Sequence, residues 1–561
     1  MDKRAVLAIV LSLVVVAVWS IFFAPAPPPP PSEVSHSTPG ERPAVAPQQD
    51  ATPAARSVSP AAGTAQRPAL PPSAHQALVT VDTGVARFML TSQGAGVKAV
   101  QLQTYRTTLA KGAPPIEIAP VPGSPTVSLA AELYMAQRVI ALGQVAFTPS
   151  QTAMTLSASQ PEGTIAFRGE LGDGLTVHRL YRFHYANYTF EVSTWVEGLQ
   201  PPAGSSMLLL WGPGLLRHTD DVARQGQTEE HPRSYVNGKI LQETPTKVGE
   251  KRVEQGQVTW TALADTYFAA VLMPREPAGD AIIAQRLEGD ALVVGLRTPL
   301  NPNRTTQTVR VYVGPKSQPL LEAAEPSLGR LIDLGWFSPL ALPMLQFLRL
   351  LDGLVHNYGV TIILATILIK IAFWPLTQTS YKSMKAMQQL QPKMKELQVV
   401  YKDDRQALNR AMMQLYREHK VNPMGGCLPM VLQIPVFFAF YNALLYAIEL
   451  RHAPFICWEK ELFWIGRGIC DLSVYDPSYI TPVLMGATMF VQQKMTPMTG
   501  DPAQAKVMQF MPLIFLWFFL WAPAGLVVYW LMNNVLSIAQ QFLVNRVAAP
   551  AVTKTEVASK G

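Results

Sequence analysis

Six apolar stretches constrain what this chain can fold into. They cover residues 5–23, 359–376, 427–450, 479–494, 508–521 and 526–545. About 20 apolar residues cross a bilayer as a helix, because a helix satisfies its backbone hydrogen bonds internally. With 48% hydrophobic and 15% charged residues among 561, the sequence predicts a multi-domain membrane protein with six α-helical spans.

The basic residues predict the orientation of the chain. Lys3 and Arg4 precede the first apolar stretch, and residues 377–421 contain nine Lys or Arg against four Asp or Glu. Because such residues accumulate in cytoplasmic loops, both chain ends and residues 377–421 are predicted to be cytoplasmic, with residues 77–325 on the opposite side. We attribute the net charge of +7 to this topology and expect no nucleic-acid site.

The first 325 residues divide into three predicted segments. Residues 1–23 are expected to form an uncleaved transmembrane anchor, because prolines flank the candidate cleavage site. Residues 24–76 are a Pro/Ala-rich linker with too few large apolar residues to fold. Residues 77–325 are predicted to form an all-β sandwich, since apolar and polar residues alternate in segments such as 308–313.

The remaining chain is predicted to be mainly helical. Its expected parts are a linker with an interfacial helix (326–357), the second span (358–376), a cytoplasmic helical hairpin (377–421), spans three to six (422–546) and a short cytoplasmic tail (547–561).

Lys370 lies inside the second apolar stretch, close to its end at Leu376. A lysine at the bilayer centre costs about 2.5–3.5 kcal/mol, so it needs a partner, water or a function. Two interpretations follow from this stretch. The side chain extends to the nearby membrane surface, or it lines a polar groove.

Other polar residues also interrupt the apolar stretches: Thr361, Thr366, Gln433, Asn442, Gln492, Asn533, Asn534, Ser537 and Gln540. Singly, such residues stabilise contacts between helices in lipid. Together with a lysine they favour a hydrated groove, although a polar-solute transporter would use the same residues.

The segment 377–421 has apolar residues in steps of three and four, which predicts two amphipathic helices in an antiparallel hairpin. The hairpin is either a spacer or a docking arm. Methionines adapt to varied apolar partners and a basic face suits acidic ones. The candidate docking residues are Met384, Lys385, Met387, Met394, Arg405 and Arg410.

Two further observations limit the chemistry. The sequence has no Gly-x4-Gly-Lys-Ser/Thr loop and no Cys/His cluster at zinc spacing, so we expect no cofactor, no metal and no enzyme. Cys457 and Cys470 lie in a loop that the predicted topology exposes to an oxidising compartment, so we predict a disulfide between them, with two free thiols as the alternative.

Several motifs resemble a known family. Residues 422–435 read Asn-Pro-Met-Gly-Gly-Cys-Leu-Pro-Met-Val-Leu-Gln-Ile-Pro, and segments 374–377, 390–393 and 520–526 accompany them. They are similar to the membrane insertases of the YidC/Oxa/Alb family, in the Gram-negative form with a large periplasmic domain.

The resemblance implies a fold and a site. Five of the six spans would form an insertase core in the inner membrane, with a groove open to cytoplasm and lipid, and the periplasmic sandwich would be of the sugar-mutarotase type. Lys370 falls where the family usually has arginine. Thr366, Gln433, Trp521 and Trp530 fall at positions of the groove or of substrate contacts.

The resemblance also implies the function. The protein is expected to insert and help fold membrane proteins, alone or with the Sec translocon, with nascent chains, the lipid bilayer, and ribosome or signal recognition components as partners. The alternatives are a membrane-tethered periplasmic carbohydrate-active enzyme and a polar-solute transporter.

Overall fold

The structure is a computed structural model, and it describes most of the chain after residue 76. The described residues are 77–118, 127–135, 138–172, 174–215, 230–242, 244–276, 280–287, 291–402, 404–419, 421, 428–458, 468–495 and 502–547. The predicted anchor, the linker and the cytoplasmic tail after Val547 lie outside these residues, as do residues 422–427 of the 422–435 motif, Cys427 among them.

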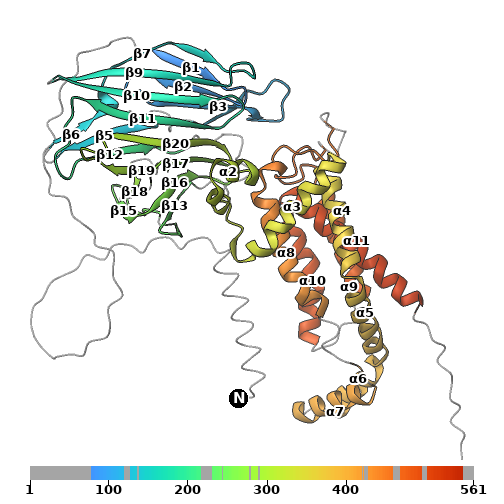
Figure 1. Cartoon of the computed structure of the whole chain (residues 1–561). Coiled ribbons are helices and arrows are strands. Elements are labelled where there is room, and N and C mark those ends of the chain that lie inside the picture. The colour runs from blue at the N-terminus through green and yellow to red at the C-terminus, as the bar shows by residue number, and fades with distance from the viewer. Residues whose placement is uncertain are drawn as a thin grey trace, which may run out of the picture. The chain divides into compact units, whose positions relative to one another are not determined.

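The first half of the described chain consists mainly of β-strands (Figure 1). Its largest sheet has nine strands, in the order β14 (Lys239–Leu241), β13 (His231–Val236), β16 (Val258–Ala264), β17 (Phe268–Pro274), β20 (Thr306–Pro315), β11 (Thr189–Glu197), β10 (Leu175–His184), β9 (Glu162–Gly172) and β7 (Phe147–Pro149).

Two smaller sheets complete this domain. One has the order β4 (Pro115–Ile118), β3 (Val97–Arg106), β2 (Ala86–Thr91), β1 (Leu78–Asp82) and β8 (Ala153–Thr155). The other has the order β15 (Lys251–Gly256), β18 (Asp280–Arg286), β19 (Leu292–Pro299), β12 (Ser206–Trp211), β5 (Ala130–Met135) and β6 (Arg138–Ala141). Neighbouring strands are antiparallel except β1 and β8, which pair in parallel.

Side chains from all three sheets form one apolar core. The ring of Phe88 on β2 lies 5.1 Å from those of Phe183 on β10 and Phe190 on β11, so the five-stranded sheet packs against the nine-stranded one. The predicted alternation is present in β20, where Val309 and Val311 are buried. Tyr312 is an exception and is also buried, because its hydroxyl group donates to the carbonyl of Pro315 at 2.6 Å and its ring lies beside that of Tyr188.

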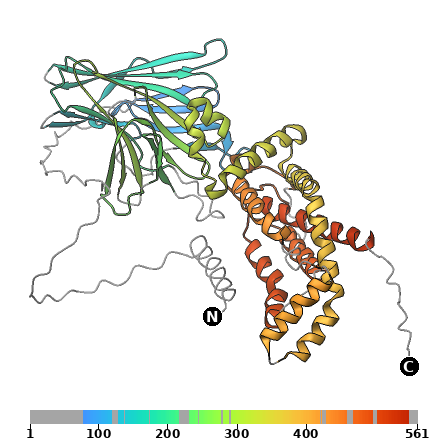
Figure 2. The ribbon, with the colours of Figure 1, turned by 60° about the horizontal axis from the view of Figure 1, so that its bottom comes forward.

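The second half is helical (Figure 2). Its helices are α2 (Gln318–Ala324), α3 (Ser338–Val355), α4 (Tyr358–Ala372), α5 (Trp374–Gln389), α6 (Gln391–Val400), α7 (Arg405–Glu418), α8 (Leu428–Tyr446), α9 (Ile480–Met495), α10 (Pro502–Phe519) and α11 (Ala524–Val547). Helices α3, α4, α8, α9, α10 and α11 contribute to a second apolar core.

The second apolar stretch is not one straight helix. Helix α4 ends at Ala372 and turns by 68° into α5. Proline at position 375 accounts for this break, because a proline is tolerated in the first turn of a helix but interrupts a continuing one. The prediction of a span over 358–376 stays a prediction, and the structure adds a bend near its end.

The helices differ in whether they could cross a membrane. In the described part of the chain, residues 524–544 of α11 are long and apolar enough by themselves, and the bent pair α4–α5 qualifies together. Residues 433–446 and 509–519 form shorter apolar helices. Phe510, Leu513 and Trp517 on α10 are 58–62% exposed, an apolar surface that water would not favour.

Candidate functional site

Lys370 occupies the last turn of α4 and points to α11. Its ammonium group donates a hydrogen bond to Ser537 Oγ at 2.8 Å. The Ser537 hydroxyl group donates in turn to the carbonyl of Asn533 at 2.7 Å, one helical turn earlier. The lysine is therefore held between two helices that are 167 residues apart in sequence.

A small cavity lies beside this pair, with a volume of about 30 Å³. It is lined by Thr366, Ile369, Lys370, Phe373 and Thr377 from α4 and α5, Gln433 and Val436 from α8, and Tyr529 and Asn533 from α11. This volume accommodates one or two water molecules, and the lining supplies several polar partners for them.

A second polar layer lies at the bend between α4 and α5. Gln540 of α11 donates to Thr377 Oγ1 at 2.7 Å and to the carbonyl of Trp374 at 3.3 Å. The carbonyl oxygen of its side chain is buried and has no partner among the described residues. These contacts connect α11 to the first turn of α5, next to the cavity.

The structure brings together three of the five groove residues that the sequence singles out: Lys370, Thr366 and Gln433. The two tryptophans lie elsewhere. Trp530 packs in an aromatic cluster, with its ring 4.7 Å from that of Phe437. Trp521 is 56% exposed. Neither side chain lines the cavity, so their expected role as groove residues is not supported by this geometry.

Tyr529 lines the cavity but was not singled out from the sequence. Helical spacing could have found it, because Tyr529, Asn533, Ser537 and Gln540 recur in steps of three or four and share one face of α11.

The predicted hairpin forms, with its first arm broken at Leu390 between α5 and α6. The N-cap of α7 is Asp404, which accepts hydrogen bonds from the next turn. Met387 and Met394 are buried between the arms, because a hairpin detached from the bundle must supply its own core. They are therefore not available as surface docking residues in this conformation.

The remaining docking candidates differ in exposure. Met384 and Lys385 are half-buried and Arg410 is exposed, whereas the side chain of Arg405 lies outside the described residues.

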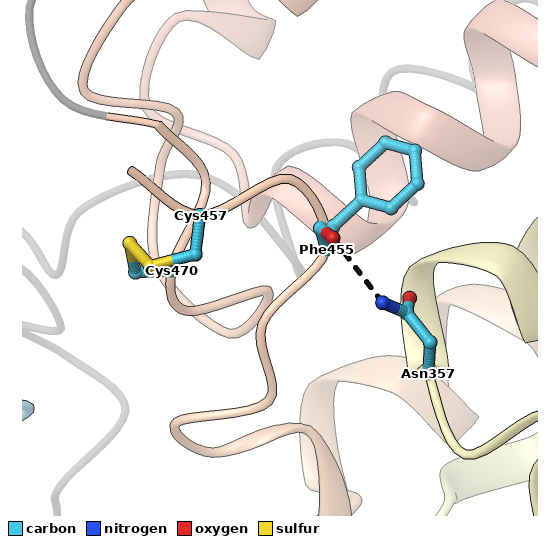
Figure 3. Close-up of a disulfide and its surroundings, with 4 residues drawn as sticks. All are labelled: Asn357, Phe455, Cys457 and Cys470. Atoms are coloured by element: carbon cyan, nitrogen blue, oxygen red, sulfur yellow. Dashed lines mark hydrogen bonds between the residues drawn. A yellow bond between two sulfur atoms is a disulfide. The ribbon is translucent and has the colours of Figure 1, made fainter. Parts of the chain in front are cut away.

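Cys457 and Cys470 are bonded in the structure, with Cα atoms 4.5 Å apart (Figure 3). The disulfide lies in the segment between α8 and α9. Near it, Asn357 at the start of α4 donates from Nδ2 to the carbonyl of Phe455 at 3.2 Å. The pairing is the one that the sequence offers as the alternative to two free thiols.

No group of three or more His, Cys, Asp or Glu side chains that could hold a metal ion occurs among the described residues. The site around Lys370 consists of a cation, amides, hydroxyl groups and aromatic rings. Such a site can attract negative charge and hydrogen-bond to polar groups.

A β-rich domain joined to helices that expose apolar surface and hold a lysine beside a small cavity is typical of a membrane protein with a large domain outside the bilayer. Comparison with known protein families identifies the family within this class. Residues 350–551 match the family model described as 60Kd inner membrane protein, and residues 78–347 match the one described as YidC periplasmic domain.

Curated relatives match along the full length. "Membrane protein insertase YidC" of Syntrophus aciditrophicus is 40% identical over 98% of this chain and 100% of its own length. The protein of the same name from Geobacter metallireducens is 36% identical over 99% of this chain and 100% of its own. A solved structure of an active YidC insertase, 18% identical, aligns with 83% of this chain and 92% of its own at a TM-score of 0.35. The chain belongs to the YidC family of membrane protein insertases.

Proposed function

We propose that this protein inserts nascent membrane proteins into the inner membrane through the polar site around Lys370. The observation that carries the proposal is the position of this lysine, which is half-buried between α4 and α11 and borders a cavity. Family membership and relatives named membrane protein insertases support the activity.

The chemistry of the lysine supports a role in attraction. An ammonium group has three N–H donors, and Lys370 uses one of them on Ser537. The other two can meet an acidic or polar group of an incoming chain. A flexible ammonium group lacks the planar fork of arginine, so the proposed interaction is electrostatic attraction without fixed two-point geometry.

Insertion would proceed in two stages. The polar segment of a substrate would first enter beside Lys370, Gln433 and Asn533, which lowers its cost of leaving water. Its apolar segment would then move sideways into lipid. Burial of apolar surface, worth about 0.8 kcal/mol per methylene, would drive this step without nucleotide hydrolysis.

The proposal includes the predicted topology. The anchor, the α4–α5 pair, α8, α9, α10 and α11 would be the six spans, with both termini and the hairpin in the cytoplasm. The β-rich domain would then be periplasmic and of the mutarotase type. Its three-sheet architecture and the basic residues of segment 377–421 support this assignment.

The hairpin is the proposed docking arm for the Sec translocon or for ribosome and signal recognition components. Exposed Arg410 and the half-buried Lys385 support an acidic partner.

Charge substitutions at position 370 test the proposal. In proteoliposomes, Lys370→Arg should insert a single-span substrate with an acidic leading segment as wild type does, and Lys370→Glu should impair it. The activities of the Lys370→Arg and Lys370→Glu variants should differ less for a substrate whose leading segment is neutral. Lys98→Glu, an exposed change on β3, is the control for net charge. Equal activity of the two variants at position 370 would rule out the charge-attraction mechanism.

Deleting residues 77–315 separates the insertase from a carbohydrate-active enzyme, because an insertase should keep most of its activity without the sheets. Solute flux into liposomes that contain this protein alone would instead favour a transporter.

A further inference from the structure

The segment between α8 and α9 folds back on itself around the disulfide. The amide of Phe455 donates to the carbonyl of Ile469 at 3.0 Å, and the amide of Leu472 donates to the carbonyl of Ala453 at 3.1 Å. Cys457 and Cys470 join the same two runs of chain covalently. We call residues 453–458 and 468–481 the stapled loop.

The stapled loop contacts the start of α4 closely. Asn357 caps this helix by accepting from the amide of Val360, and its Nδ2 donates to the carbonyl of Phe455 (Figure 3). A Cβ atom added to Gly359 would lie 2.0 Å from the Phe455 ring. The first turn of α4 therefore has no room for a side chain at position 359.

The same loop also holds the start of α11. The amide of Ala524 donates to the carbonyl of Val474 at 2.6 Å, and the amide of Gly525 donates to the carbonyl of Leu472 at 2.9 Å. The first amides of a helix have no partner within it, so these two carbonyls satisfy groups that would otherwise be unpaired.

Helix α9 begins within the stapled loop. The carboxylate of Asp476, which is fully buried, accepts from the amides of Ser478 and Thr481 at 2.9 and 2.8 Å. The stapled loop thus contacts the first residues of α4 and α11 and contains the first residues of α9. Lys370 lies in the last turn of α4, and Ser537 lies near the middle of α11.

We propose that the Cys457–Cys470 disulfide is a positioning element for the insertion site: by stapling this loop it holds α4 and α11 at their starts, and so keeps Lys370 opposite Ser537. The proposal rests on the proposed function and topology. It makes the geometry of the polar site depend on the oxidation state of a distant cysteine pair.

The bond would form in the periplasm by thiol–disulfide exchange. The two thiols together lose two protons and two electrons, and a disulfide-bearing oxidant of that compartment takes them up and becomes a dithiol. A crosslink across 13 positions restricts the open conformations of the loop, which is how it would stabilise the contacts to three helices.

Hydrogen exchange of the full-length protein tests the positioning role. On reduction, the amides at the starts of α4, α9 and α11 should exchange roughly tenfold faster or more, while those of α6 and α7 stay unchanged. The double variant Cys457→Ser/Cys470→Ser should show the fast exchange with or without reductant. Cys427→Ser, the matched control with the third cysteine removed, should respond as wild type does.

Insertion measured in the same samples links the loop to function. Reduction should slow insertion by wild type roughly threefold or more and leave the double serine variant unaffected. Gly359→Ala should reproduce the faster exchange of α4 and the slower insertion while the disulfide stays intact. If the exchange rates at the three helix starts are the same with and without reductant, the inference is overturned, even if insertion is normal. Absent insertion by the oxidised wild type would instead overturn the proposed function.

Discussion

Two cations, a buried one in the β-rich half and a half-buried one in the helical half, have different surroundings. Arg179 in the β-rich domain is 1% exposed, and its Nη1 donates to the carbonyls of Gly94, Ala95 and Leu129 at 2.9–3.1 Å. Lys370 in the helical half has one hydrogen-bond partner among the described residues, Ser537, and borders a cavity.

The difference separates a structural cation from one with free capacity. Through Nη1 and Nε, Arg179 joins the loop before β3 and the residue before β5 to β10 and β11, while its buried Nη2 has no partner among the described residues and borders no cavity found there. Lys370 uses one of its three donors on Ser537 and borders the cavity. Burial alone therefore does not identify a functional charge, whereas unused hydrogen-bonding capacity beside a cavity does.

The largest effect is expected from Arg179→Met. Three buried carbonyls would lose their donor, which should lower the free energy of unfolding by roughly 3 kcal/mol or more. Urea denaturation followed by the fluorescence of buried Trp211 and Trp260 measures it. Arg182→Met on the same strand, where the side chain is exposed, should change stability by less than about 0.5 kcal/mol. Equal losses in both variants would remove the structural role of Arg179.

Lys370→Met should show the opposite pattern. Stability should be kept, because methionine fills similar space in lipid, while insertion of an acidic substrate should slow by about 10- to 100-fold, the value of a charged hydrogen bond. Proteoliposome insertion and thermal unfolding measure the two effects. A variant that loses stability and keeps insertion would place Lys370 in the same structural class as Arg179.

The β-rich domain offers a pH test of its buried charges. Burial lowers the pKa of Lys316 to about 8, and Arg233 contributes while Asp265 and Asp333 oppose it. Between pH 8 and about 10.5 the unfolded chain binds more protons at this lysine, so stability should rise with pH across that window, by on the order of 1 kcal/mol. Urea titrations at several pH values measure the rise. The rise in stability with pH should disappear in Lys316→Met. If the rise persists in this variant, other titratable groups cause it.

The smallest effect is expected from Ser537→Ala. Lys370 would lose its acceptor but keep its charge, so insertion should slow about two- to tenfold. Thr379→Ala, which removes an exposed hydroxyl group on α5, is the control in the same assay. A loss as large as that of Lys370→Met would mean that orientation of the ammonium group matters as much as its charge.

Much of the fold could be predicted from local patterns. Alternation of apolar and polar residues indicated the strands, and apolar spacing located the helices between residues 427 and 545. The bend at Phe373 was missed because apolar residues continue through it, although Pro375 was visible. The burial of Met387 and Met394 was also missed, since an amphipathic pattern does not say whether its apolar face meets a partner or its own hairpin.

The candidate site was predicted in part. The cavity brings together Lys370, Thr366 and Gln433, whereas Trp521 and Trp530 do not line it, and the role of all five in a groove stays a prediction. Tyr529 and Trp530 are adjacent in sequence but about 100° apart around a helix, so the rotation of α11 decides which of them faces the cavity. Helical spacing groups Tyr529 with Asn533, Ser537 and Gln540, but only the packing of α11 against α9 and α4 decides that this face meets the cavity.

By itself, the sequence determined the class of each segment, the predicted orientation and the presence of a charge among apolar residues, because these depend on composition and spacing along the chain. Only the tertiary structure decided that Lys370 meets Ser537, that Arg179 joins three backbone carbonyls, and that one disulfide-stapled loop holds three helix starts. These pairings join residues up to 167 positions apart, and they exist only once the helices have packed.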